Sequence, residues 1–254
     1  MSTNDAALTQ TLAHERISSN DPFTRYGFLV AHNPGRTHFE ETKRKFTDFI
    51  TDSLAGYSGV ASKLKRLEDY HNFIAEHQID HHAFIKSAGR SLPASLLESE
   101  YLLGAIDFCQ NYFGSKMRLY KNFGEFRVSR PNEQDFNPFH RDHWFGYFTP
   151  LLNLYLPIAG SWCDSAMQIV PKSHLWTDEQ ARPTFLAGQN KTEKDGIKFS
   201  VPTLEYCEYP LDAHCPDILP GDFMLFSPKM VHGNGVNVSI ETRFSFEIRL
   251  EFLD

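Results

Sequence analysis

The sequence predicts an α+β protein in which a jelly-roll-like barrel carries a layer of helices on one face. Two patterns support this fold class. Apolar residues recur at helical spacing from residue 37 to 114, and short β-rich runs separated by Gly, Pro and Asn follow from residue 117 onward. With 254 residues, 41% hydrophobic and 22% charged, the chain can bury a substantial core. We expect one domain, 1–254, with a mostly helical part (1–116) followed by the barrel (117–254).

Three helices are expected in the N-terminal part. Apolar spacing predicts one around Phe46 and a second around Tyr70. The third is expected from about Ala94 to Tyr112, because Pro93 precedes it and Gly114 follows it. Together these helices would supply the layer that covers the barrel.

Five strands are expected in the barrel part, at residues 117–120, 147–156, 166–170, 223–226 and 243–252. The last is the clearest, because apolar and polar residues alternate strictly along it. One face would carry Phe244, Phe246, Ile248, Leu250 and Phe252, and the other Arg243, Ser245, Glu247 and Arg249. Periodicity alone leaves open whether the polar face meets solvent or a site.

The charge balance argues against two classes of partner. The chain has 25 Lys and Arg against 32 Asp and Glu, which gives a formal net charge of −7. Nucleic acids and anionic membranes attract cationic surfaces, so we expect neither as a partner. The first ten residues lack the basic segment of a signal peptide, and no apolar run is long enough to span a bilayer. These features predict a cytoplasmic protein.

Two histidines and an aspartate are candidates for a metal site. His140 and Asp142 lie two residues apart, so an extended backbone would place both side chains on one side. Such a pair plus a distant histidine is what a two-His, one-carboxylate Fe(II) site requires. The spacing alone is uninformative, because 12 His and 32 acidic residues produce such pairs by chance. The other such pair, His38 and Glu40, falls in a predicted helix, where this spacing points the side chains apart. Context favours the first pair, which joins a loop to a β-rich segment, while His232 follows a buried strand and precedes glycines.

Several ordered motifs give the chain a resemblance to a known family. They are His140-x-Asp142, Leu154-Tyr-Leu-Pro157, Val170-Pro-Lys-Ser-His174, Pro220-Gly-Asp222, His232 and Arg243. In this order, over roughly residues 117–252, they resemble the iron(II)/2-oxoglutarate-dependent oxygenases of the phytanoyl-CoA dioxygenase type. Family members often read Pro-Gly-Ser-His where this chain reads Pro171-Lys-Ser-His174.

The resemblance implies a double-stranded β-helix core, Fe(II), 2-oxoglutarate as cosubstrate, and O2. It implies that His140, Asp142 and His232 hold the iron and that Arg243 binds the far carboxylate of 2-oxoglutarate. The chemistry agrees, because the planar guanidinium of Arg offers a carboxylate two parallel hydrogen bonds and so suits it better than Lys. Further candidates for cosubstrate contacts are Ser245, on the face of Arg243, and Asn153, Tyr155 and Asn234.

The presence of Asp142 narrows the implied reaction. Related halogenases lack this carboxylate, so the resemblance favours hydroxylation or another oxidation of a C–H bond, with release of succinate and CO2. We expect a small-molecule substrate, such as one of secondary metabolism, because no dense basic cluster supports a CoA ester. Trp144, Arg127 and Trp162 are candidate substrate contacts. The polar stretch 177–198 is a candidate lid, with a disordered insertion as the alternative.

Two other functions stay open. The chain could be a cupin-like metalloenzyme that does not use 2-oxoglutarate, or a non-catalytic barrel that binds a small molecule. Among the other histidines, His143 could replace a ligand, but an extended backbone would point it away from His140. His81 and His82 are adjacent but lack a third partner at a recognisable spacing, so we expect a surface or second-layer role for them.

Overall fold

The computed structural model describes residues 21–135, 137–145, 151–184, 192–194, 197–199 and 202–253. The helices are α2 (Pro22–Tyr26), α3 (Phe39–Ser58), α4 (Tyr70–Glu76), α5 (His81–Ala88), α6 (Ala94–Leu97) and α7 (Glu100–Phe113), with 3-10 turns η1 (Arg36–His38), η2 (Leu67–Asp69), η3 (Asp142–Phe145) and η4 (Ser173–Leu175). The strands are β1 (Phe28–Ala31), β2 (Met117–Ser129), β3 (Leu151–Ala159), β4 (Gln168–Ile169), β5 (Ala181–Pro183), β6 (Thr192–Lys194), β7 (Ile197–Phe199), β8 (Leu204–Cys207), β9 (Phe223–Phe226), β10 (His232–Gly233) and β11 (Arg243–Phe252).

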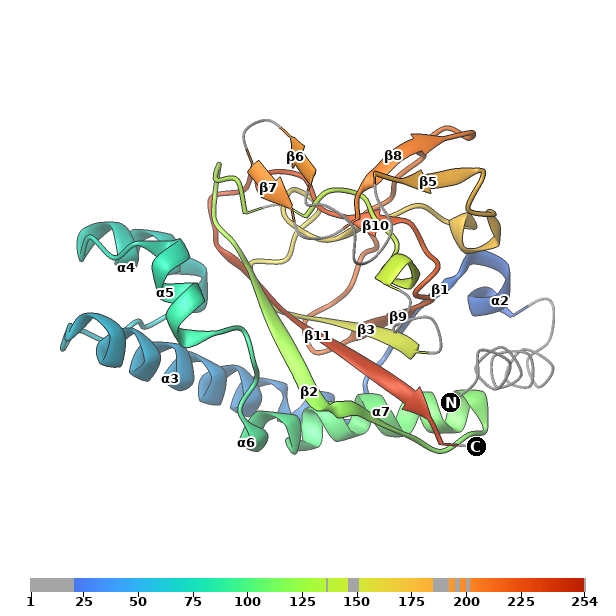
Figure 1. Cartoon of the computed structure of the whole chain (residues 1–254). Helices are drawn as coiled ribbons and strands as arrows, with labels where there is room; N and C mark the ends of the chain where they lie inside the picture. Colours follow the sequence, from blue (N-terminus) through green and yellow to red (C-terminus); the bar gives the residue numbers. More distant parts are fainter. Residues whose placement is uncertain are drawn as a thin grey trace.

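Two β-layers form the body of the molecule (Figure 1). The larger is an antiparallel sheet in the order β1-β9-β3-β11-β2. The smaller is built on the β10–β4 pair and is extended on its two sides by single bridges, His140 to His232 and Ile169 to His214. This is the predicted α+β fold, a double-stranded β-helix with a helical layer.

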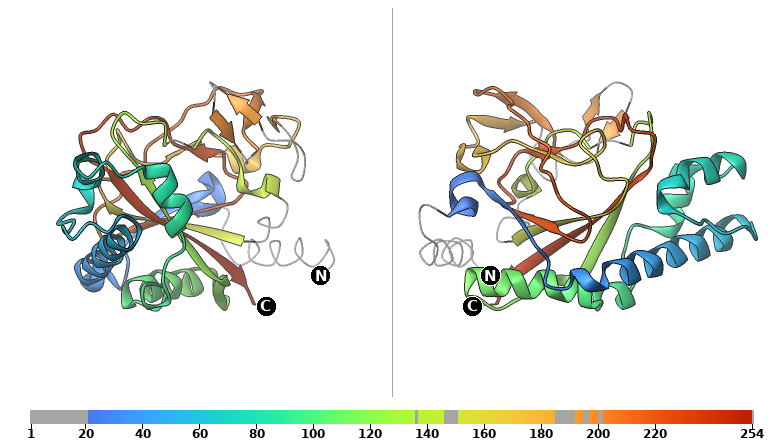
Figure 2. Two further views of the ribbon diagram at one scale, coloured as in Figure 1. Left: turned by 60° about the vertical axis from the view of Figure 1, so that its left-hand side comes forward. Right: turned by 180° about the vertical axis from the view of Figure 1, so that it is seen from behind.

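Helices α3, α6 and α7 lie on the outer face of the larger sheet, and Figure 2 shows α3 and α7 along one side of it. The buried ring of Phe46 on α3 lies 4.9 to 5.7 Å, between centroids, from the rings of Phe126, Phe244 and Phe246. The apolar face predicted for the last strand is therefore the face that packs on the helices. Its polar face, which begins with Arg243, is turned toward the smaller sheet.

The structure corrects the boundaries of three elements, of which the strand expected over 166–170 is only the two-residue β4. The helix expected over 94–112 is two helices, because the Ser99 side chain accepts a hydrogen bond from the Leu102 backbone N–H at 3.4 Å and caps a new helix. The strand expected over 117–120 continues to Ser129. Lys121 and Asn122 adopt positive φ angles of 54° and 51°, which are typical of a turn. The strand nevertheless continues, because its pairing with β11 resumes beyond these two residues.

Parts of two expected elements fall outside the described residues. The strand expected over 147–156 is seen from Leu151 to Ala159, and residues 147–150 lie outside. Of the expected lid 177–198, residues 185–191 and 195–196 lie outside, and the described pieces include β5, β6 and part of β7. Strand β1, which pairs with β9, was not predicted. No helix within the described ranges is long and apolar enough to cross a membrane.

Candidate metal centre

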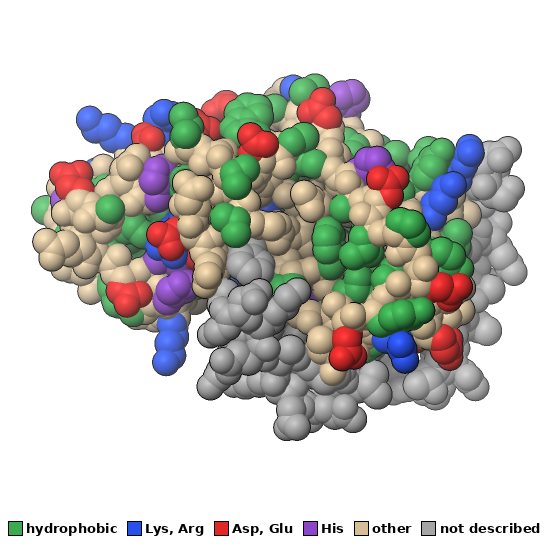
Figure 3. All heavy atoms as spheres, turned by 90° about the horizontal axis from the view of Figure 1, so that it is seen from above, with side chains coloured by type: hydrophobic (Ala, Val, Ile, Leu, Met, Phe, Trp, Pro, Cys, Tyr) green, Lys and Arg blue, Asp and Glu red, His purple; other side chains and the backbone are tan. Residues whose placement is uncertain are grey.

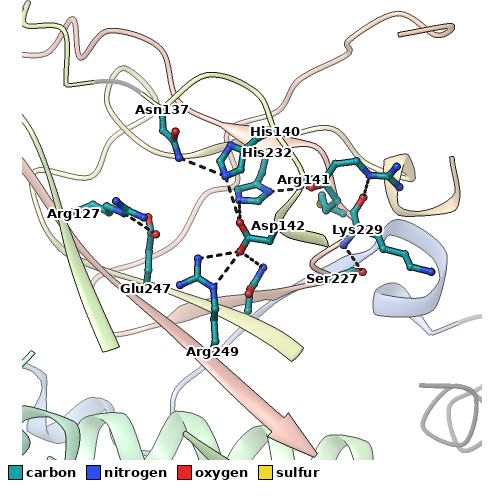
Figure 4. Close-up of polar contacts among 12 residues, drawn as sticks. Arg127, Asn137, His140, Arg141, Asp142, Ser227, Lys229, His232, Glu247 and Arg249 are labelled. Atoms are coloured by element: carbon teal, nitrogen blue, oxygen red, sulfur yellow. Dashed lines mark hydrogen bonds and ion pairs between the residues drawn. The ribbon is translucent and has the colours of Figure 1, made fainter. Parts of the chain in front are cut away.

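Three buried side chains meet in the space between the two sheets (Figure 4). One ligand-type atom each from His140, Asp142 and His232 lies within 4.8 Å of the other two. The Oδ1 atom of Asp142 is 3.4 Å from His140 Nε2 and 3.8 Å from His232 Nε2. Two imidazole nitrogens and one carboxylate oxygen at this range form a donor set suited to a non-haem Fe(II) ion.

Backbone pairing places the two histidines. The His140 N–H donates to the His232 carbonyl at 2.9 Å, and the His232 N–H donates back at 3.0 Å. Asp142 opens the 3-10 turn η3, so the segment after His140 is a tight turn and not the expected extended strand. The extended backbone assumed for the orientation of His143 is therefore not formed. The His143 Nε2 atom lies 2.9 Å from an Asp178 oxygen.

The backbone also fixes the orientation of both imidazoles. His140 Nδ1 lies 2.8 Å from the Pro138 carbonyl and His232 Nδ1 lies 2.9 Å from the Met230 carbonyl. A carbonyl only accepts hydrogen bonds, so each Nδ1 carries the proton and each Nε2 presents a lone pair toward Asp142. Burial and the neighbouring His140 lower the pKa of His232 to about 4, which keeps it in the neutral, metal-binding form.

The carboxylate of Asp142 is held by two donors from the larger sheet. Its Oδ2 atom accepts hydrogen bonds from Arg249, at 3.1 and 3.3 Å, and from the Asn153 amide at 3.1 Å. Burial alone would raise the pKa of Asp142, but the Arg249 guanidinium and the two imidazoles outweigh it and hold the pKa well below its usual range. The group is therefore an anion and a ready ligand.

Arg141, between the two ligands in sequence, anchors the turn from the other side. Its side chain is 1% exposed and donates to the backbone carbonyls of Ser173 at 3.2 Å and Trp176 at 2.9 Å. It also pairs with Asp178 at 3.1 Å. Because a buried guanidinium needs all these partners, the turn that carries Asp142 is tied to the η4 segment.

A cavity of about 200 Å³ opens beside the three side chains. Arg243 lines it, is 3% exposed, and has a buried Nε atom that finds no hydrogen-bond partner among the residues the structure describes. Among the same residues, the buried Oγ of Ser245, two positions along the same strand face, also lacks a partner. Unsatisfied buried donors are rare in folded proteins, so these two await an acceptor that a carboxylate would supply. The residues present therefore fit both Fe(II) and 2-oxoglutarate.

A comparison with known protein families shows to which family this chain belongs. Residues 42–245 match the family described as Phytanoyl-CoA dioxygenase (PhyH). The chain belongs to the phytanoyl-CoA dioxygenase family. It is an iron(II)/2-oxoglutarate-dependent oxygenase, as the sequence resemblance implied. A search of curated proteins found no match.

Solved structures share the fold of this family member. EctD from S. alaskensis, solved with 2-oxoglutarate and 5-hydroxyectoine, is 12% identical, with a TM-score of 0.51 over 99% of this chain and 76% of EctD. EvdO2 from Micromonospora carbonacea var. aurantiaca, complexed with 2-oxoglutarate, is 11% identical, with a TM-score of 0.51 over 92% of this chain and 90% of EvdO2. At these identities the likeness concerns the fold.

Of the other residues predicted for the oxygenase site, some line the cavity and some do not. Arg127, Asn153 and Asn234 line it. Three others do not line it and point to partners elsewhere: the Trp144 indole N–H donates to Asp178 at 3.3 Å, the Tyr155 hydroxyl bonds Ser161 at 2.9 Å, and Trp162 is 57% exposed with its N–H on Glu241. The structure does not bring these three to His140, Asp142 and His232.

Two cavity residues, Glu247 and Arg249, were given no role from sequence. The alternation of the last strand placed both on the face of Arg243, and this sequence pattern could have identified them as site residues. Arg249 reaches Asp142, and Glu247 accepts a hydrogen bond from Arg127 at 2.9 Å. Arg127 also pairs with Glu125 at 3.0 Å. Asn153, expected near the cosubstrate, instead donates to Asp142.

A second group of possible metal ligands contains His81 and His82. The expectation that they lack a third partner is wrong in space, because Asp135 comes within reach of both. However, both Asp135 oxygens accept hydrogen bonds from Arg130, at 2.7 and 2.9 Å, and the Tyr70 hydroxyl is 2.9 Å from His81 Nδ1. A guanidinium already neutralises this carboxylate, so the cluster is better explained as a structural ion pair.

Proposed function

We propose that this oxygenase hydroxylates, or otherwise oxidises, a C–H bond of a small molecule, with release of succinate and CO2. In this proposal His140, Asp142 and His232 hold the iron, and Arg243 with Ser245 binds the far carboxylate of 2-oxoglutarate. The observation that carries it is the buried Nε of Arg243, which lies in the cavity that the three ligands share and has no hydrogen-bond partner in the described part of the chain.

Iron and 2-oxoglutarate together would supply the oxidant, and the protein supplies placement. The hydrogen bonds from both Nδ1 atoms to backbone carbonyls keep the imidazole lone pairs aimed at one point. Arg243 would fix one end of the cosubstrate through its planar fork. Asn234, which lines the same cavity, is a further candidate for cosubstrate contact.

Several observations support a small substrate. The cavity volume of about 200 Å³ lies below the range of roughly 300–1,000 Å³ usual for pockets that hold drug-sized ligands. Arg127 faces the cavity but is matched by Glu125 and Glu247, so it offers an anionic substrate little unpaired charge. EctD, which shares this fold, was solved with a small molecule, 5-hydroxyectoine.

The proposal includes no nucleic-acid or membrane partner and a cytoplasmic location. The net charge is −7. On the face seen in Figure 3, Lys and Arg side chains are scattered among acidic ones and do not gather into a basic patch. A phosphate-binding surface would need such a patch.

The direct test is a screen for succinate release from 2-oxoglutarate in the presence of metabolite pools. We expect one or more pools to stimulate release by the wild-type enzyme and none to stimulate the Asp142→Ala variant. Substrate-dependent product formation without 2-oxoglutarate would contradict the proposal and favour a cupin-like enzyme of another kind. Binding of a metabolite with no turnover by either protein would favour a binding barrel.

A further inference from the structure

We propose that Arg249 and Asn153 are positioning residues that make Asp142 a one-oxygen ligand. The proposal rests on the iron ligands assigned under the proposed function. The two carboxylate oxygens of Asp142 have different surroundings (Figure 4). Oδ2 is occupied by Arg249 and Asn153, whereas Oδ1 faces His140 and His232.

The sheet register makes both donors part of a rigid frame. Arg249 on β11 and Asn153 on β3 are cross-strand partners, so their side chains leave the sheet side by side on the same face. Asn153 is 2% exposed and the Arg249 side chain is 15% exposed. Asp142 lies on a turn, and a turn alone leaves a carboxylate free to rotate. The two strand residues remove that freedom by holding one oxygen.

The consequence concerns the open positions on the metal. A two-His, one-carboxylate centre works because positions remain open for the cosubstrate and oxygen. A carboxylate that bound through both oxygens would fill one of them. Three contacts from N–H groups on Oδ2 oppose that rearrangement, because the oxygen would have to leave a guanidinium and an amide.

A competing explanation predicts the opposite change in metal affinity when Arg249 is removed. If Arg249 only balances the charge of Asp142, it repels a metal dication, and its removal should tighten metal binding. If it positions the carboxylate, its removal should weaken metal binding. Asn153 separates the two explanations further, because it is uncharged and its loss removes a donor without changing the electrostatic balance.

The test measures Fe(II) affinity anaerobically by competition with a chromogenic chelator, and the visible spectrum of the Co(II)-loaded protein as a reporter of coordination number. The variants are Asn153→Ala, Arg249→Gln and Arg249→Lys. Arg118→Gln is the matched control, because Arg118 also pairs with a carboxylate, that of Glu251 on the neighbouring strand β11, but at the exposed surface. Thermal unfolding of the metal-free proteins verifies that each variant folds.

We expect Asn153→Ala and Arg249→Gln to bind Fe(II) about 10- to 100-fold more weakly than wild type and to change the Co(II) spectrum. Arg249→Lys should recover part of the lost affinity. Arg118→Gln should match wild type in both measurements. Unchanged or tighter binding by Asn153→Ala and Arg249→Gln would overturn the inference while leaving the proposed function intact. If Arg249→Gln does not fold, Asn153→Ala decides. A wild-type protein that binds no Fe(II) would overturn the ligand assignment and this inference with it.

Discussion

Replacing Arg243 by Gln tests how the enzyme holds its cosubstrate. Arg243 is 3% exposed, so its charge is not screened by solvent, and its buried Nε has no partner within the described residues. A 2-oxo acid can chelate iron through its keto and adjacent carboxylate oxygens, which leaves the far carboxylate of 2-oxoglutarate for this guanidinium. Gln keeps one donor and loses both the charge and the fork geometry.

The expected loss follows from the strength of the missing contacts. A hydrogen bond to a charged group contributes about 1.5–3 kcal/mol, and a guanidinium can make two to one carboxylate. If Gln recovers part of one contact, the net loss is about 3 kcal/mol. At about 1.4 kcal/mol for each factor of ten, this is about 100-fold in the dissociation constant of 2-oxoglutarate.

The assay is an anaerobic titration of the Fe(II)-loaded protein with two acids, 2-oxoglutarate and 2-oxopentanoate, which lacks the far carboxylate. Arg243→Gln should weaken binding of 2-oxoglutarate by about 100-fold and leave binding of 2-oxopentanoate nearly unchanged. Equal losses for both acids would refute the reasoning, because they would mean that Arg243 acts through the fold. No loss for either acid would refute it as well.

Three further predictions concern stability. Phe46→Ala should lower the free energy of unfolding in urea by about 3–5 kcal/mol, because its ring is fully buried against three others; a loss below 1 kcal/mol would contradict this packing. Burial lowers the pKa of His81 to about 4 from the ordinary 6.5, so the unfolded chain binds a proton between these values that the folded protein does not. His81 alone should therefore make stability fall by at most about 1.4 kcal/mol per unit as pH drops through that window, and His81→Gln should reduce the wild-type slope by up to that amount. Gly160→Ala should lower the melting temperature, because φ is +58° and a Cβ would clash with a backbone carbonyl, whereas Gly56→Ala, with open space around it in α3, should raise it.

Much of the fold could be predicted because its signals are periodic. The strict alternation of β11 identified both its faces, and the structure shows that the apolar one packs on Phe46. Elements whose signals are not local were missed. Strand β1 is only four residues long and is defined by its pairing with β9, and the extension of β2 beyond Lys121 depends on pairing with β11. Such pairing is a tertiary effect that overrides local turn chemistry.

The sequence predicted which residues form the candidate site better than it predicted the contacts among them. Motif order singled out His140, Asp142 and His232, and the structure brings them together. Alternation placed Arg249 on the correct face but could not give the distance to Asp142, which depends on how a turn folds over the sheet. Trp144, a predicted substrate contact, does not line the cavity, because its position also depends on how this turn folds.

The central claim is that this chain binds Fe(II) and 2-oxoglutarate together at one centre. The most direct measurement is the anaerobic absorption spectrum of the Fe(II)-loaded wild-type protein as 2-oxoglutarate is added. A weak visible charge-transfer band should appear and saturate at one cosubstrate per iron, and it should be missing in His232→Ala. A wild-type protein that holds iron but develops no band on adding 2-oxoglutarate would contradict the claim.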